Sequence, residues 1–117
     1  MNFCNDFKYD LKLGQIKEKE LAELLNYSSI EVKTDLQAAK TGNVFVEYKS
    51  RKQLSGIATT KADFYCFVIS KYAFIFITTE TLKAKCRVYF NTSRDIKGGD
   101  NNTSQGILLP VKDLYGH

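Results

Sequence analysis

Two acidic residues and one lysine stand at a spacing suited to hydrolysis of a phosphodiester bond. Asp35 is followed, after 11 intervening residues, by Glu47, and Lys49 comes two positions later. Alternate residues of a strand share a face, so Glu47 and Lys49 are expected together, about 6.6 to 7 Å apart. With Asp35 beside them, the carboxylates and a nearby carbonyl form an all-oxygen site for Mg²⁺, which Mn²⁺ can replace. A metal ion activates water, and an ammonium group stabilises the developing charge.

The strands that must position these residues follow from hydrophobic alternation. Residues 29–35 and 44–50 each alternate apolar and polar side chains, and a glycine turn lies between them at residues 40–43. We expect the two strands to pair as a hairpin, which would bring Asp35 beside Glu47.

Two later segments are apolar and aromatic throughout. Residues 63–70 and 72–78 are therefore predicted to be interior strands buried on both faces. Residues 107–111 are predicted to form a last short strand, which Pro110 confines to an edge of the sheet. The polar residues 91–105 between them are predicted to form a loop.

Two helices complete the predicted fold. Residues 13–25 place their leucines on one side of a 3.6-residue repeat, and residues 81–86 form a short helix capped by Thr78 or Thr79, with Glu80 in its first turn. The fold class is therefore α/β, with one central mixed sheet flanked by helices in the order α-β-β-β-β-α-β. We expect residues 1–117 to form a single domain.

Composition restricts the classes of function. Lysine and arginine number 17 against 13 acidic residues, giving a net charge of +4 that suits an anionic partner. The cysteines at 4, 66 and 86 are odd in number, and His117 is the only histidine, so neither a disulfide framework nor a His/Cys zinc site fits. Apolar stretches are too short to span a membrane, and the acidic N-terminus does not resemble a signal peptide. A reduced, cytoplasmic protein is expected.

The spacing of Asp35 and Glu47-Tyr48-Lys49 resembles the PD-(D/E)XK nuclease superfamily in its Asp-x(n)-Glu-x-Lys form. The segment 13–21, LGQIKEKEL, is similar to the Gly-x-x-x-Glu helix that precedes this motif in archaeal Holliday-junction resolvases and several phage nucleases. Residues 55–57 (Ser-Gly-Ile) and 61–63 (Lys-Ala-Asp) also resemble small phage-type members. Thr34 stands where the name-giving proline would be.

The resemblance implies a restriction-endonuclease-like core and a Mg²⁺-dependent endodeoxyribonuclease in a bacterial or archaeal cell, including a phage-encoded one. It makes Glu18 the helix acid, Asp35 the shared metal ligand and Glu47 the second ligand. Lys49 becomes the catalytic lysine, and the carbonyl of Tyr48 completes the metal sphere. Glu20 remains an alternative to Glu18, because both lie at the margin of the apolar face of the helix.

The partner implied is duplex or branched DNA. Basic residues beside the motif are expected to contact phosphates, namely Arg51, Lys52, Lys40 and Lys61. A specific DNA interface buries about 1,000 to 2,500 Å², which is large for a chain of this size, so a homodimer is expected. Two active sites on a two-fold axis would suit cleavage of both strands or resolution of a junction.

Three alternatives remain open at this point. The first is that Glu47 and Lys49 lie on an ordinary solvent-exposed face, since any antiparallel strand with one such face alternates as residues 44–49 do. Phe45 on the face of Glu47 argues against it. The chain could instead be a non-catalytic DNA-binding or assembly subunit with a nuclease-like fold. A nuclease that acts on RNA or single strands is the third alternative.

Overall fold

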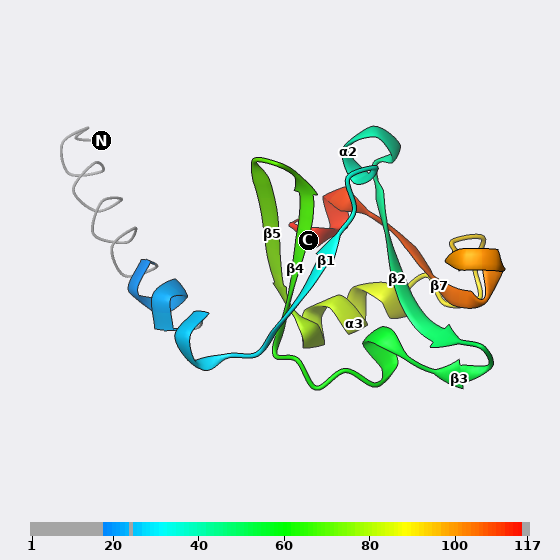
Figure 1. Ribbon diagram of the computed structural model, residues 1–117, viewed down its shortest axis with the longest axis horizontal. Helices are drawn as coiled ribbons and strands as arrows, with labels where there is room; N and C mark the ends of the chain where they lie inside the picture. The colour runs from blue at the N-terminus through cyan, green and yellow to red at the C-terminus, as the bar shows by residue number, and fades with distance from the viewer. Residues whose placement is uncertain (1–17, 24, 116–117) are drawn as a thin grey trace, which may run out of the picture.

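The computed structural model describes residues 18–23 and 25–115, which form two sheets and several helices (Figure 1). One sheet has the strand order β1-β4-β5 and the other has the order β3-β2-β7-β6. The strands are β1 (Ile30–Thr34), β2 (Asn43–Ser50), β3 (Gln53–Leu54), β4 (Phe64–Ser70), β5 (Ala73–Thr78), β6 (Asp95–Gly98) and β7 (Ser104–Pro110). The α-helices are α2 (Ala38–Thr41) and α3 (Thr79–Arg87), and the 3-10 helices are η1 (Gly56–Ala58), η2 (Asp100–Asn102) and η3 (Val111–Leu114).

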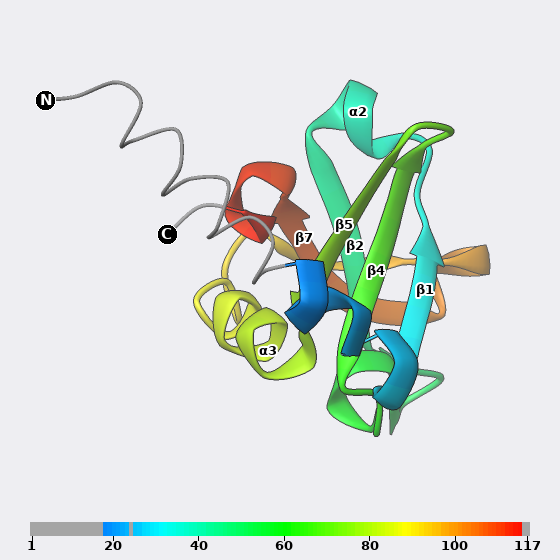
Figure 2. The same cartoon turned by 90° about the vertical axis from the view of Figure 1, so that its left-hand side faces the viewer.

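The predicted α/β class is confirmed, but the single central sheet is wrong. The sheet β1-β4-β5 is mixed, since β1 runs parallel to β4, whereas β3-β2-β7-β6 is antiparallel throughout. The hydrophobic core joins both sheets to α3, which contacts β4, β5 and β7 (Figure 2). Its most deeply buried large side chains are Tyr65, Phe67, Leu82, Ile107, Leu109 and Val44.

The predicted hairpin between β1 and β2 is wrong, because each strand pairs elsewhere. Ser29 and Asp63 exchange hydrogen bonds in both directions, which fixes the start of β1 against the start of β4. After β1 the chain makes a helical turn, α2, and leaves it through Gly42 in the left-handed conformation (φ 76°). A helical turn redirects the chain, unlike the two-residue turn of a tight hairpin, so β2 joins the second sheet.

The predicted burial of the strands is only partly correct. β4 is the central strand of its sheet, but β5 lies at an edge, and Phe74 and Phe76 on it are 59% and 41% exposed. Conversely, β7 is not an edge strand, because it lies between β2 and β6. Pro110 is tolerated there because it occupies the last position of β7, where the ladder ends. The predicted loop at residues 91–105 also contains β6, which pairs with β7.

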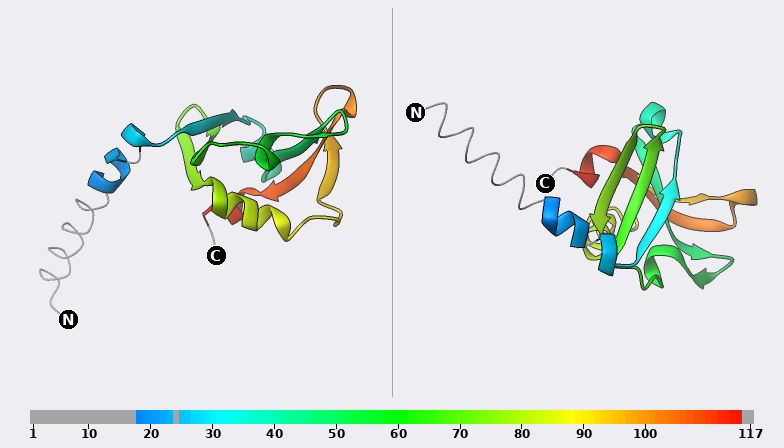
Figure 3. Two further views of the ribbon diagram at one scale, coloured as in Figure 1. Left: turned by 90° about the horizontal axis from the view of Figure 1, so that it is seen from below. Right: turned by 60° about the vertical axis from the view of Figure 1, so that its left-hand side comes forward.

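The helix predictions are confirmed where the structure describes them. Residues 18–23 and 25–27 are helical, while residues 13–17 and 24 of the predicted segment lie outside the described residues. Helix α3 begins as predicted, since the Thr78 hydroxyl accepts a hydrogen bond from the backbone N–H of Thr81. Figure 1 and Figure 3 show residues 18–23 and 25–27 on the side of the molecule away from β3. Among the helices of the described part of the chain, none is long and apolar enough to cross a membrane.

Two glycines allow the Phe45 ring to lie flat across the second sheet. A Cβ atom on Gly106 of β7 would stand 2.6 Å from Cζ of Phe45 and 2.6 Å from the backbone oxygen of Val46. A Cβ atom on Gly98 of β6 would stand 2.8 Å from the same Cζ atom. The absence of side chains at these two positions therefore makes the space that Phe45 fills.

We expect Gly106→Ala to lower the free energy of unfolding by about 3 kcal/mol, because the added methyl group meets a backbone oxygen that cannot rotate away. Gly42→Ala is the matched control. Its φ of 76° disfavours alanine, but nothing lies within 4 Å of the added atom, so a loss of about 1 kcal/mol is expected. Urea denaturation of both variants checks this, and an equal loss in the two would refute the packing argument.

Candidate functional site

Four basic side chains line one cleft at the end of the second sheet. Lys49 comes from β2, Arg51 and Lys52 from the turn between β2 and β3, and Lys97 from β6. The rest of the lining is polar and uncharged, from Asn102, Thr103, Ser104 and Gln105. The cavity measures about 380 Å³, and among the described residues no acidic side chain lines it. We call these eight residues the basic cleft.

The turns that build the basic cleft hold their residues in the left-handed conformation. Arg51 and Lys52 have φ values of 49° and 69° and connect β2 to β3 directly. Asn-Gly is the usual choice for such a turn, since a residue with a Cβ atom is strained there by about 1 to 2 kcal/mol. The backbone N–H of Arg51 donates to the oxygen of Thr103 at 2.9 Å, which ties this turn to the connection between β6 and β7. Two long cations thus occupy strained positions at the rim of the cleft.

Glu47 is held beside the basic cleft by two serine hydroxyls. Ser104, which lines the cleft, donates to Oε1 of Glu47 at 2.6 Å, and Ser55 donates to Oε2 at 2.9 Å. Gly56 packs against the same strand, since a Cβ atom there would stand 2.3 Å from the backbone oxygen of Glu47. The segment 55–57 that the resemblance singled out therefore contacts the Glu47 segment directly.

A β-bulge at Tyr48 overturns the prediction that Glu47 and Lys49 share a face. Glu47 opposes Gly106 on β7, while Lys49 opposes the adjacent residue, Gln105. Successive residues of β7 point to opposite faces, so the extra residue in β2 puts Lys49 out of phase with Glu47. Both residues are nevertheless linked to the basic cleft, because Glu47 accepts a hydrogen bond from Ser104 of its lining and Lys49 lines it directly.

The side chain of the bulge residue joins a hydrogen-bond network around Asp95. Tyr48 donates its hydroxyl proton to Oδ1 of Asp95 at 2.7 Å, and Gln105 donates to the same oxygen at 2.8 Å. The backbone N–H of Asn91 donates to Oδ2 at 2.9 Å. Burial alone would raise the pKa of Asp95, but these three hydrogen bonds lower it below the usual value. The pKa of Tyr48 is raised to about 12, mainly by burial and secondly by the Asp95 carboxylate.

Sequence reasoning missed this network, because Asp95 falls in the segment predicted to be a loop. Only the pairing of β6 with β7 brings Asp95 to the same region as Tyr48 and Gln105. Tyr48 itself was assigned a role only through its backbone carbonyl. That carbonyl accepts a hydrogen bond from the backbone N–H of Ser55 at 3.0 Å.

Asp35 and Glu18 are not assembled with Glu47 as predicted. Asp35 follows β1 in the other sheet, where its backbone N–H donates to Val68 and its Oδ1 accepts from the N–H of Gln37. These contacts make it the first residue of the turn into α2. Glu18 is an exposed helical residue, as is Glu20.

The oxygens of Glu47 and Tyr48 that were predicted to hold Mg²⁺ already accept hydrogen bonds. Both carboxylate oxygens of Glu47 accept serine hydroxyls, and the Tyr48 carbonyl accepts a backbone N–H. Across residues 18–23 and 25–115, no group of three or more His, Cys, Asp or Glu side chains could hold a metal ion. Since Mg²⁺ usually keeps several waters and is held by one or two carboxylates and substrate phosphates, the magnesium site stays a prediction.

Sequence reasoning did not assign Lys33 to the site, but this cation shares a different cavity with Glu47. Lys33 of β1 and Glu47 line one cavity of about 220 Å³ between the two sheets, together with Tyr65 and Phe67. The Tyr65 hydroxyl there is buried and has no hydrogen-bond partner within the described residues. Burial and the neighbouring Glu31 carboxylate raise its pKa. Alternation placed Lys33 on the polar face of its strand, but the approach of the two sheets brings it into one cavity with Glu47.

The predicted DNA contacts divide into two groups. Arg51 and Lys52 line the basic cleft with Lys49. Lys40 is exposed in the last turn of α2, and Lys61 lines a separate cavity with Asp63 and Glu80. Lys97 also lines the cleft, and it lies in β6, within the segment 91–105 that was predicted to be a loop.

Comparison with known proteins finds no matching family model, no matching curated protein and no matching solved structure.

We expect Asp95→Asn to flatten the acid side of the stability profile. Because the pKa of Asp95 is lowered in the fold, its contribution is present above the unfolded value near 3.8 and is lost as the pH falls through the folded value. The difference in free energy of unfolding between wild type and variant should therefore shrink as the pH falls from roughly 5 to 2, the window that this linkage sets. Urea denaturation at each pH measures it. Asp100→Asn, an exposed residue of the neighbouring turn, is the control and should leave the slope unchanged.

Proposed function

We propose that this protein binds the phosphodiester backbone of DNA in the basic cleft. The observation that carries the proposal is the convergence of Lys49, Arg51, Lys52 and Lys97 on a single cavity with no acidic residue in its described lining. Like charges gathered in this way repel one another, and a polyanion removes that cost while releasing its own counterions. Asn102, Thr103 and Gln105 add neutral hydrogen-bonding groups of the kind that position a backbone.

The strain of the Arg51-Lys52 turn supports the same proposal. A turn optimised for stability alone would carry Asn-Gly, as the chain itself nearly does with Asn101-Asn102, whose φ values are 57° and 54°. Instead, two cations occupy positions that disfavour them. We infer that their charge at the rim of the cleft matters more than the local strain energy.

The double substitution Arg51→Asn with Lys52→Gly should therefore separate stability from binding. We expect the free energy of unfolding to rise by about 1 kcal/mol or more, because the turn strain is relieved. DNA affinity should fall, and the slope of log K against log salt should become shallower by about 2, since each lost phosphate contact removes about 0.9. Fluorescence anisotropy with a labelled duplex and a four-way junction over a salt series measures both.

Two single substitutions control this experiment. Lys97→Gln, from the opposite side of the cleft, should reduce the salt slope by about 1. Lys112→Gln removes an exposed lysine of η3, outside the cleft, and should leave the slope unchanged. Equal losses in both variants would show that binding depends on net charge alone and not on the cleft.

Metal-dependent cleavage of the bound DNA is the second candidate function. The specific observation in its favour is that Glu47, the central acid of the PD-(D/E)XK-like motif, hydrogen-bonds to Ser104 in the wall of the basic cleft. A scissile phosphate held by Lys49 would thus lie beside a carboxylate. The restriction-endonuclease-like core and the role of Mg²⁺ belong to this candidate and rest on the sequence motif, since the acid groups stand apart in the fold.

A nicking assay separates the two candidates. Supercoiled plasmid and a four-way junction are incubated with protein and Mg²⁺ or Mn²⁺, and again with EDTA. If the protein is a nuclease, nicking requires the metal and disappears in Glu47→Gln, while that variant still shifts DNA in a gel. Lys61→Gln serves as the control that should retain cleavage. DNA that is shifted but never cut supports the binding protein, and single-stranded and RNA substrates in the same gel test the remaining alternative.

A homodimer remains part of this proposal. The outer side of the sheet β1-β4-β5 exposes Val32, Phe74 and Phe76, with 59%, 59% and 41% of their surface accessible. An exposed apolar face of this kind favours association with a second copy, which would double the basic surface available to DNA. The free, buried thiols of Cys66 and Cys86 agree with the predicted reducing, cytoplasmic location, which stays a prediction.

A further inference from the structure

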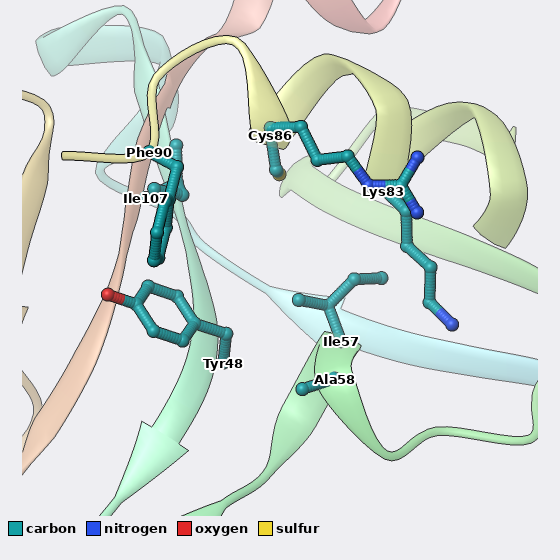
Figure 4. Close-up of a pocket in the computed structure, with 8 residues that line it drawn as sticks. Tyr48, Ile57, Ala58, Lys83, Cys86, Phe90 and Ile107 are labelled. Carbon is teal, nitrogen blue, oxygen red and sulfur yellow. The ribbon is translucent and has the colours of Figure 1, made fainter. Parts of the chain in front are cut away.

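A second cavity, distinct from the basic cleft, opens between α3, η1 and β7 (Figure 4). It measures about 270 Å³ and lies at the lower end of the range for small-molecule sites. Tyr48 and Phe90 form its aromatic wall, and Ile57 and Ile107 supply apolar contacts. Such a volume suits one planar ring system and a small polar group, not a DNA helix.

The aromatic wall is fixed and accessible. The rings of Tyr48 and Phe90 meet edge to face, with centroids 5.6 Å apart and planes at 62°. The hydrogen bond from the Tyr48 hydroxyl to Asp95 holds that ring in place, and a pKa of about 12 keeps it uncharged. Phe90 is 52% exposed although it borders a cavity, so its ring offers free apolar surface to a ligand.

The opposite wall carries positive charge. Lys83 and Arg87 both line the cavity and stand four residues apart on α3, which places them on one face of the helix. Figure 4 shows Lys83 across the cavity from Tyr48. Cys86 in the same wall adds no charge, because burial raises the pKa of its thiol to about 12. Within the described residues no carboxylate lines this cavity.

We propose that this cavity binds a planar heterocycle that carries a phosphate, either a free nucleoside 5′-monophosphate or a single unstacked nucleotide of a DNA strand. The base packs against Tyr48 and Phe90, and the phosphate pairs with Lys83 and Arg87. The proposal does not depend on DNA binding in the basic cleft, since the two sites share no lining residue.

The test uses 2-aminopurine, a fluorescent base whose emission falls when it stacks on an aromatic ring. The full chain is titrated with 2-aminopurine deoxyriboside 5′-monophosphate, and separately with a short single-stranded oligonucleotide that contains one 2-aminopurine. We expect saturable quenching that Phe90→Ala weakens roughly 5- to 100-fold, the range for loss of one base-stacking ring. Arg87→Gln should weaken it too, through loss of the phosphate contact.

Two variants are matched controls. Tyr72→Ala removes an aromatic ring that is 92% exposed in the turn before β5, and Lys97→Gln removes a cation of the basic cleft. Neither should change the quenching of the free monophosphate, so failure of the DNA-binding proposal would leave that result intact. Thermal unfolding checks that each variant folds. If Phe90→Ala does not fold, the result for Arg87→Gln alone decides the proposal.

The outcomes are distinct. Quenching of the free monophosphate assigns the site to a mononucleotide, and quenching only within the oligonucleotide assigns it to a nucleotide of a strand. The proposal is overturned by absence of quenching in both, by equal binding of the nucleoside without its phosphate, or by unchanged binding in Arg87→Gln.

Discussion

The antiparallel pairing of β2 with β7 is the interaction on which both candidate sites depend. It runs from Asn43 opposite Pro110 to Ser50 opposite Ser104 and is interrupted by the bulge at Tyr48. Before the bulge, the pairing sets the Phe45 ring over Gly106. Beyond it, Ser104 reaches Glu47 and Lys49 enters the basic cleft. The extra residue in β2 therefore puts Lys49 out of phase with Glu47.

At the bulge, neighbouring residues of β2 contribute to the two cavities proposed as binding sites. Glu47 hydrogen-bonds to the wall of the basic cleft, and the next residue, Tyr48, belongs to the aromatic wall of the second cavity. The Asp95 network holds Tyr48 in place from β6, the strand that also supplies Lys97 to the cleft. A displacement of β6 would thus affect both cavities, since the core between the sheets is closely packed.

Some elements were predictable because their physics is local. Alternation located β1 and β2, the capping threonine located the start of α3, and Gly42 marked the turn between the first strands. The polar stretch at residues 91–105 misled, because a short strand rich in polar residues, β6, has the composition of a loop. Its place in the sheet comes from pairing with β7, and composition does not record pairing.

The sequence by itself determined the α/β class, the basic character and the chemical motif of Glu47 and Lys49, since charge, periodicity and residue type are properties of the chain alone. Only the tertiary structure decided that Asp35 and Glu47 belong to different sheets, that Lys33 shares a cavity with Glu47 and that Lys97 joins the basic cleft. Strand partners are chosen by burial summed over the whole fold, and a bulge reverses side-chain direction without leaving a mark in local alternation. The residues that share a site therefore come from segments that the sequence keeps apart.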